Sequence, residues 1–441
     1  MEDQTKAAIQ EKLADALERD FPASTRREAR LPSLPGKAHA IIGMRRAGKT
    51  FFLFQCLQDE LTRGVARERL VYFNLEDERL GSMGAEDLSL IMETYYRRFP
   101  TFRRREEVVF CFDGIQLVPG WERFVRRIMD SEKTRVFLSG SSAGMLSREV
   151  ATSMRGRAME TVITPFSFRE FLSYRNLKPP AGGETPSARH RSVLQAAFDD
   201  YVRRGGFPEA QAAEREEDRT RLLQGYVDAV LFRDVAERHS VQNLSALRLM
   251  VRQLLRNPAT PLSVSKISRD FHSQGIAASK ETLLSFMTYL EDAFLVFALP
   301  VFARSERRRQ VNPRKLYLAD HGLAAAFSPT ATLDRGHLLE NIVACELARC
   351  SRDLAYYKTP GGLEVDFISR GFDGRERLIQ VAADVSDPRT WQREVAALQE
   401  AKAARPQAEL LLLCEEVPDR GMEIPEGIHV EPVWRWLLGG R

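Results

Sequence analysis

The sequence is short of cysteine pairs and of long apolar runs, and each shortage excludes a class of protein. None of its cysteines forms a Cys-x-x-Cys pair and their number is odd, which argues against a zinc ribbon or a disulfide framework and favours a reducing compartment. The longest apolar run, residues 293–303, contains Pro300 and is too short to cross a bilayer. The cysteines are Cys56, Cys111, Cys345, Cys350 and Cys414.

Strong charge of one sign is also lacking. The formal net charge is +4 over 441 residues, so any contact with nucleic acid has to be argued from local patches. The first residues, Met-Glu-Asp-Gln-Thr, are polar and acidic, unlike a signal peptide, and we expect a cytoplasmic protein with no membrane partner. The length predicts roughly two to four domains.

A glycine-containing stretch between two apolar runs carries the clearest chemistry. Gly43 to Thr50 reads G-x-x-x-x-G-K-T between residues 38–42 and 51–54, which predicts a strand, a phosphate-binding P-loop and a helix. Backbone N–H groups and the helix dipole would face the phosphates, Lys49 would neutralise them, and Thr50 would ligate Mg²⁺. ATP and Mg²⁺ are therefore the expected cofactors. The predicted nucleotide-binding residues are Gly43, Arg45, Arg46, Ala47, Gly48, Lys49, Thr50 and Phe51.

Two later strands are expected to end in polar residues beside this loop. Residues 108–112 are apolar and end in Asp113, which predicts a Walker B strand whose carboxylate holds Mg²⁺ beside Thr50. Residues 135–140 form another strand, followed by Ser141, which either senses the γ-phosphate or serves as ordinary turn chemistry. The basic connector at residues 26–30 is expected to be solvated surface.

Arg157 is an expected contact to a second copy of the chain. An arginine at this position could reach the γ-phosphate of a neighbouring subunit and stabilise charge in the transition state. A surface arginine is the alternative. The first possibility predicts a homo-oligomer.

Two helices and a hairpin between residues 263 and 319 predict a winged helix and a DNA partner. Residues 263–293 form the helices, and residues 294–302 and 315–319 form the strands. The hairpin loop is basic, with one acid, Glu306, and its cations suit phosphate contacts on a duplex. Packing between domains is the alternative. The cations are Arg304, Arg307, Arg308, Arg309, Arg314 and Lys315.

The order of these motifs resembles a prokaryotic AAA+-like P-loop ATPase family with a winged helix and a C-terminal restriction-endonuclease-like domain of formerly unknown function. The motifs are GMRRAGKT, NLEDERL, VVFCFDGIQ, LSGSSAGMLS, RGR, PFSFREF and GGFPE. The resemblance implies an α/β fold with an N-terminal helix and connector (1–35), a P-loop ATPase domain with a helical lid (36–225), a winged helix (226–328) and a nuclease-like domain (332–441).

The sequence departs from the family pattern after the Walker B aspartate, where Gly114 replaces the glutamate that polarises water. Either hydrolysis is slow, or a carboxylate of the neighbouring strand serves, with Glu76 and Asp77 as the candidates. These two residues could instead end their strand with solubilising charge.

In the C-terminal domain the resemblance implies an acid on the first helix, an aspartate on the second strand and an E-x-K motif on the third. The matching residues are Glu340, Asp366 and Gln380, which would surround Mg²⁺. The lysine position holds Ala382, and Lys358 is the nearby substitute, so a binding or structural role is favoured over cleavage.

The sequence as a whole predicts a Mg²⁺-dependent ATP-binding protein, an ATPase that couples nucleotide state to a DNA-facing C-terminal half. Two alternatives stay open: a nucleotide-gated DNA- or protein-binding module with little hydrolysis, and an ATP-regulated nuclease.

Overall fold

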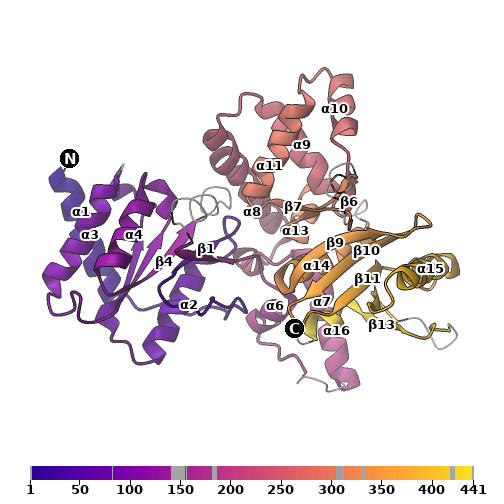
Figure 1. Cartoon of the computed structure of the whole chain (residues 1–441), viewed down its shortest axis with the longest axis horizontal. Coiled ribbons are helices and arrows are strands. Elements are labelled where there is room, and N and C mark those ends of the chain that lie inside the picture. Colours follow the sequence, from indigo (N-terminus) through magenta and orange to yellow (C-terminus); the bar gives the residue numbers. More distant parts are fainter. Residues whose placement is uncertain are drawn as a thin grey trace. The chain divides into compact units, whose positions relative to one another are not determined.

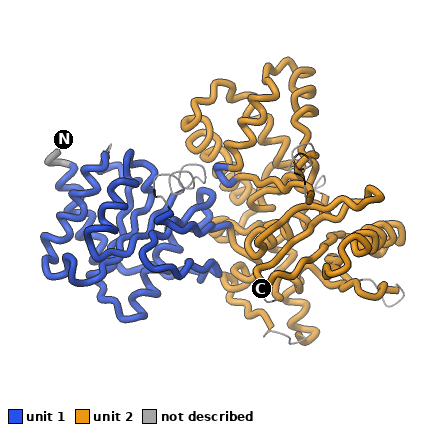
Figure 2. The backbone as a smooth tube through the Cα atoms, viewed as in Figure 1, with its two compact units in different colours: residues 1–164, 292–294 blue, residues 165–291, 295–441 orange. Residues whose placement is uncertain are grey.

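The computed structural model describes residues 2–81, 83–140, 154, 156–180, 186–303, 305, 307, 309, 312–328, 334–417 and 423–439. Its contacts divide the chain into two compact units, coloured separately in Figure 2: residues 1–164 with 292–294, and residues 165–291 with 295–441. The predicted domain limits near residues 225 and 328 lie inside the second unit and remain predictions. No helix in the described part of the chain is both long and apolar enough to cross a membrane.

The first unit is built on a parallel five-stranded sheet. The strand order is β2-β3-β4-β1-β5, so β4 lies between the P-loop strand β1 and the Walker B strand β3. β4 therefore separates these two strands, and all three end at the same edge of the parallel sheet. The strands are β1 (Ala38–Ile42), β2 (Leu70–Asn74), β3 (Val108–Asp113), β4 (Thr134–Gly140) and β5 (Ala158–Val162).

Helices cover both faces of this sheet (Figure 1). One core contains residues of α1, α3 and α4, and the other contains residues of α2 and the connector. Alternate residues of β3 enter different cores: Phe110 and Phe112 join the first, and Val109 and Cys111 the second. Burial on both faces explains why the strand is a continuous apolar run. The helices are α1 (Glu2–Glu18), α2 (Lys49–Thr62), α3 (Ala85–Arg98) and α4 (Trp121–Ser131), with 3₁₀ turns η1 (Arg67–Arg69), η2 (Glu78–Leu80) and η3 (Ile115–Leu117).

The second unit begins with helices that pack around a glycine pair. The backbone N–H of Gly206 donates to Asp320 Oδ2 at 2.6 Å, and a Cβ on Gly205 would lie 2.1 Å from Asp320 Oδ1. The GGFPE motif therefore has a packing role, because only glycine admits the buried carboxylate. The helices are α6 (Phe168–Tyr174), α7 (Ala188–Arg204), η4 (Glu209–Ala212), α8 (Glu216–Ala229), the π-helix η5 (Val230–Glu237), α9 (Leu244–Arg256) and α13 (His321–Phe327).

A small antiparallel sheet and two helices follow in the region predicted to be a winged helix. The sheet has the order β6-β8-β7. The elements are β6 (Thr260–Leu262), α10 (Val264–Ser273), α11 (Lys280–Asp292), β7 (Val296–Leu299) and β8 (Arg314–Leu318).

The C-terminal region holds a mixed five-stranded sheet in the order β13-β12-β11-β10-β9. β9, β10 and β11 form an antiparallel meander, and β12 and β13 add parallel strands. The predicted order of helix, three strands, helix and strand is confirmed. The elements are α14 (Arg335–Cys350), β9 (Ser351–Lys358), β10 (Glu364–Gly371), β11 (Glu376–Ala382), α15 (Pro388–Ala404), β12 (Glu409–Cys414), β13 (Ile428–Pro432) and α16 (Val433–Leu438).

Candidate active site

The loop between β1 and α2 has a backbone that needs glycine at two positions. Gly43 has φ 144°, and a Cβ there would lie 2.1 Å from the carbonyl oxygen of Ile163. Gly48 has φ 99° and is the N-cap of α2, which begins at Lys49. Because glycine has no side chain to cap the helix, the first N–H groups of α2 are left to an anion.

The P-loop lysine lies across its own loop. Lys49 Nζ donates hydrogen bonds to the carbonyl oxygens of Gly43, at 3.0 Å, and Met44, at 2.9 Å. The ammonium group is therefore held over the loop, where the predicted phosphates would lie.

Asp113, at the end of β3, accepts hydrogen bonds from three hydroxyl groups. Thr50 Oγ1 donates to Asp113 Oδ2 at 2.7 Å, and the Tyr72 hydroxyl donates to the same oxygen at 2.8 Å. The Ser139 hydroxyl donates to Asp113 Oδ1. Burial, and then the Asp113 charge, raise the pKa of Tyr72 well above its usual value, so Tyr72 stays a donor. The hydroxyl and carboxylate oxygens of Thr50 and Asp113 are ligands of the kind that Mg²⁺ prefers.

Glu76 fills the space that a side chain at position 114 would need. β2 and β3 are neighbours, with Asn74 opposite Asp113, so the residues after each strand lie close together. A Cβ on Gly114 would lie 2.8 Å from Glu76 Cγ, and Gly114 has φ 78°. The Glu76 side chain is 48% exposed, and its Oε1 lies 4.0 Å from the Arg45 guanidinium.

Asp77, the second candidate carboxylate, faces the first helix. Its Oδ2 lies 2.6 Å from Lys12 of α1 and 2.9 Å from Arg79, and its Oδ1 accepts from the Arg79 backbone N–H. The hydrogen bonds from Arg79 and Lys12 hold the pKa of Asp77 well below its usual range. Asp77 therefore joins α1 to the end of β2, and Glu76 alone lies against Gly114.

The other predicted loop residues differ in exposure. Ala47 is fully buried, whereas Phe51 is 49% exposed beside the loop. Arg46 has a positive φ of 64°. The prediction that the connector is solvated surface was wrong for Arg27, which is buried. Arg27 donates hydrogen bonds to the carbonyl oxygens of Ala47 and Thr164, and so joins the connector to the P-loop.

Arg157 lies at the edge of the sheet away from its own P-loop. Its carbonyl oxygen accepts from the Ala38 N–H at the start of β1, whereas Gly43 follows the end of that strand. Its guanidinium lies 2.5 Å from Asp130. The predicted sensor, Ser141, lies outside the described residues.

The candidate nuclease residues come together around a lysine from another element. Lys315 Nζ of β8 lies 2.8 Å from Glu340, 3.0 Å from Glu364 and 3.0 Å from Asp366. Gln380 Oε1 accepts from the Asp366 backbone N–H at 3.1 Å. Lys315 is only 4% exposed, which corrects its assignment as a phosphate contact on the hairpin surface.

The charges of this buried cluster influence one another. Burial lowers the pKa of Lys315, but the three carboxylates outweigh it and leave the pKa raised. Burial raises the pKa of Glu340, and Asp366 raises it further. Lys358, the predicted substitute, is exposed on β9. In the ranges that the structure describes, no three His, Cys, Asp or Glu side chains are arranged to hold a metal ion.

The hairpin cations are only partly described. Arg307, Arg309 and Arg314 are exposed, and Arg309 donates to the Ala303 carbonyl oxygen at 3.1 Å. Arg304 and Arg308 lie outside the described residues.

Sequence reasoning missed Tyr72 and Ser139, and it assigned Arg27 and Lys315 to the surface. Ser139 follows the apolar residues 136–138 of β4 and lies opposite Asp113, and a polar residue at that strand end is a signal that could have identified it. Tyr72 lies opposite Cys111, and its bond to Asp113 depends on the register of β2 on β3. Arg27 and Lys315 depend on tertiary contacts and have no local signal.

Family models match two parts of the chain. Residues 35–172 match the model described as "AAA domain", and residues 195–334 match a domain of unknown function, DUF8612. The first match contains every residue of the nucleotide site except Arg27.

A relative matches over nearly the whole length. The chain is 30% identical to the uncharacterised protein MJ1544 of Methanocaldococcus jannaschii, over 98% of this chain and 96% of the relative. The chain belongs to the MJ1544 family. It is also 28% identical to an uncharacterised protein of Haemophilus influenzae, over 79% of this chain and 82% of that protein. Among solved structures, the Walker-type ATPase PABY2304 of Pyrococcus abyssi is similar, with 15% identity, a TM-score of 0.41 and coverage of 73% of this chain and 95% of that chain.

The family match and the geometry agree on the first unit. In this member of the MJ1544 family, an AAA domain with a complete P-loop motif carries the nucleotide site, and the predicted AAA-like P-loop ATPase is confirmed at that level.

Proposed function

We propose that this chain binds ATP with Mg²⁺ and hydrolyses it, and that Glu76 orients the attacking water in place of the glutamate missing after Asp113. The observation that carries the proposal is the 2.7 Å hydrogen bond between Thr50 and Asp113. It supports the proposal because it joins the two oxygen atoms that would hold the expected ion beside the P-loop.

The residues of the chain have separate tasks in this mechanism. Lys49 would exchange its bonds to the loop carbonyls for bonds to the β and γ phosphates. Mg²⁺, when bound, neutralises phosphate charge. Thr50 and Asp113 would hold the ion, while Tyr72 and Ser139 keep the carboxylate in position through their hydroxyl groups.

Glu76 is the better of the two candidate bases because its side chain lies against Gly114. The glycine leaves open the volume that the usual glutamate would occupy, and the Glu76 side chain enters it from the neighbouring strand. Its exposure of 48% leaves the carboxylate open to water. Asp77, which is bound to Lys12 and Arg79, is assigned the structural role of ending the strand.

Arg157 and Ser141 complete the proposed site. The five residues of β1 span about 17 Å, so Arg157 cannot reach its own nucleotide and would act on that of a second copy. In the single chain, the Arg157 guanidinium forms an ion pair with Asp130. Ser141 follows β4 and is our candidate contact to the γ-phosphate.

For the second unit we propose a winged helix next to a restriction-endonuclease-like domain. The order α9, β6, α10, α11, β7, β8 supports the winged helix, and the exposed Arg307, Arg309 and Arg314 are its candidate DNA contacts. The order of helix, three strands, helix and strand supports the second domain. Because Lys315 occupies the centre of its acid cluster, we assign that cluster a structural role.

A second candidate function is a nucleotide-gated binding module with little hydrolysis, which Gly114 favours. The variant Glu76→Gln separates the two functions. If Glu76 is the base, the variant should lower the rate of ATP turnover by about 10²- to 10⁴-fold with little change in ATP affinity. Asp77→Asn is the matched control and should leave turnover nearly unchanged, and Lys49→Ala should abolish ATP binding. Equal turnover in Glu76→Gln and the wild type would reject Glu76 as the base.

A further inference from the structure

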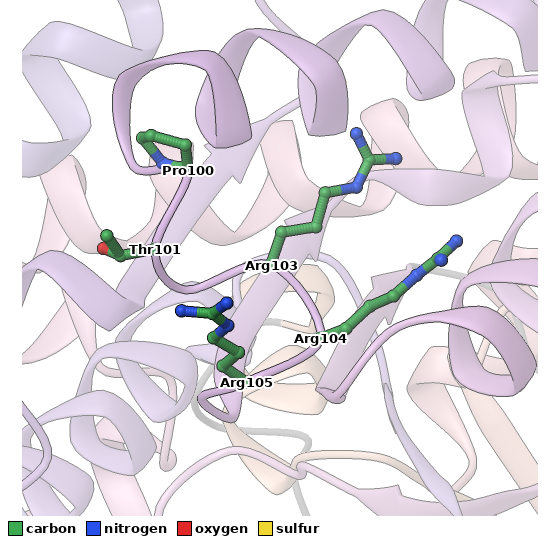
Figure 3. Close-up of a pocket in the computed structure, with 5 residues that line it drawn as sticks. All are labelled: Pro100, Thr101, Arg103, Arg104 and Arg105. Atoms are coloured by element: carbon green, nitrogen blue, oxygen red, sulfur yellow. The ribbon is translucent and has the colours of Figure 1, made fainter.

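The end of α3 and the first part of the segment that joins it to β3 are unusually basic. Residues 97–105 read Arg-Arg-Phe-Pro-Thr-Phe-Arg-Arg-Arg and contain no acid. Glu106 and Glu107 follow before β3, and they pair with Arg69 and Arg135. We call residues 97–105 the arginine turn. Pro100, Thr101, Arg103, Arg104 and Arg105 line a surface pocket of about 560 Å³, in which Arg103 and Arg104 extend in the same direction (Figure 3).

Aromatic contacts and a backbone hydrogen bond support the turn. The rings of Phe99 and Phe102 stack with centroids 5.5 Å apart and an interplanar angle of 16°, and Tyr95 of α3 packs against Phe99 at 5.3 Å. The Arg105 N–H donates to the Phe102 carbonyl oxygen at 3.1 Å, and Arg104 has a positive φ of 60°. A non-glycine residue in this region is uncommon, and such residues cluster at functional sites. The aromatic rings therefore present the arginines on a rigid base.

Few acids neutralise these arginines. Glu132 is shared by Arg103, at 3.2 Å, and Arg104, at 3.7 Å. Within the part of the chain that the structure describes, no carboxylate lies within ion-pair distance of Arg97, Arg98 or Arg105. All five arginines of the turn are exposed.

The turn is separate from the nucleotide site. It precedes Val108 at the start of β3, whereas Asp113 is at the end of that strand, about 17 Å away. The two sites therefore lie at opposite edges of the sheet.

We propose that the arginine turn binds the phosphate backbone of a nucleic-acid duplex. Several guanidinium groups spread over a rigid, solvent-exposed surface suit a ligand with repeated phosphates. Phe99 and Phe102 are stacked on each other and partly buried, so they offer no face for an unpaired base. They also offer no exposed apolar anchor for a membrane. Contacts to phosphates alone predict binding without sequence preference.

The test measures binding of the full chain to a labelled DNA duplex of mixed sequence by fluorescence anisotropy, over a series of salt concentrations. The variant replaces Arg97, Arg98 and Arg105 by glutamine. Three lost phosphate contacts should make the slope of log K against log salt shallower by roughly 2.7. The ratio of wild-type to variant affinity should therefore be roughly 500-fold larger at about 0.1 M salt than at about 1 M salt.

The control carries the same change of charge elsewhere: Arg189→Gln, Arg191→Gln and Arg221→Gln, all at exposed positions of the second unit. It should keep the wild-type slope. A slope unchanged in the turn variant, an equal fall in the control, or no binding of duplex by the wild type would overturn the proposal. The proposal would also be overturned if the turn variant kept its binding to DNA but lost binding to vesicles of anionic phospholipid. ATP turnover without DNA should be the same in all three proteins, so failure of the proposed ATPase shows separately.

Discussion

Replacement of Lys315 by methionine tests whether the acid cluster of the second unit depends on its internal cation. The ammonium lies within 3.0 Å of oxygen atoms of Glu340, Glu364 and Asp366, and methionine keeps similar bulk without charge. The variant therefore leaves three carboxylates together, two of them buried, without their counter-ion.

The expected cost is large because one partner of a buried ion pair is removed. Such changes cost about 3–5 kcal/mol. For a unit of this size, about 1 kcal/mol lowers the melting temperature by roughly 2–4 °C, so the transition of the second unit should fall by roughly 6–20 °C. Lys358→Met is the control: this lysine is exposed on β9 and should change the transition by less than about 2 °C.

The pH dependence gives a second readout. Burial raises the pKa of Glu340 and Lys315 lowers it, so removing the cation raises this pKa further. A carboxyl group with a raised pKa stabilises the fold only while it stays protonated. The deficit of Lys315→Met should therefore be larger near about pH 8 than near about pH 5.5. Differential scanning calorimetry at both pH values measures it. An equal melting temperature for the wild type and Lys315→Met would refute the assignment of a structural ion cluster.

Two further predictions concern the first unit. Gly114→Ala forces a Cβ to within 2.8 Å of Glu76 Cγ at a positive φ, and we expect it to cost about 1–2 kcal/mol of stability and to lower ATP turnover. Gly64→Ala is the control, because Gly64 also has a positive φ but a Cβ there would meet nothing within 4 Å. This control should lose stability and keep its ATP turnover. Turnover that falls equally in both glycine variants would contradict the role of Glu76. Arg157→Gln should abolish any rise in specific ATPase activity with protein concentration, measured by dilution. Asp130→Asn, which removes the ion-pair partner of Arg157, should keep that rise. A rise that persists in Arg157→Gln would reject the action of Arg157 on a second copy.

The nucleotide site could be predicted from the sequence because its signals are local. A P-loop motif between two apolar runs places Lys49 and Thr50 on known elements, and an apolar run buried on both faces places Asp113 at the end of a strand. The strand order of the sheet then brings Thr50 and Asp113 together. For these residues, periodicity and spacing were sufficient.

The remaining parts depend on tertiary contacts that no local pattern records. Lys315 was assigned to the basic hairpin loop together with the neighbouring arginines, yet β8 pairs with β6 and β7 and its lysine is buried against α14 and β10. The position of Glu76 against Gly114 requires the register of β2 on β3. Arg27 is buried by contacts with residues 20 and 137 positions away. A basic residue in a connector gives no sign of such burial.

The geometry of the P-loop also determines what a substitution of Lys49 can reveal. In the single chain, Lys49 donates to two carbonyl oxygens of its own loop, so nucleotide binding must exchange these bonds for bonds to phosphate. The exchange is favourable because the ammonium group then faces a charged phosphate oxygen instead of a neutral carbonyl oxygen, and the attraction between opposite charges is added. Lys49→Ala leaves two partly solvated carbonyl oxygens, which water can satisfy, so the fold loses little. We therefore expect this variant to melt within about 2 °C of the wild type while it loses ATP binding, and a large fall in melting temperature would mean that the lysine primarily holds the loop together.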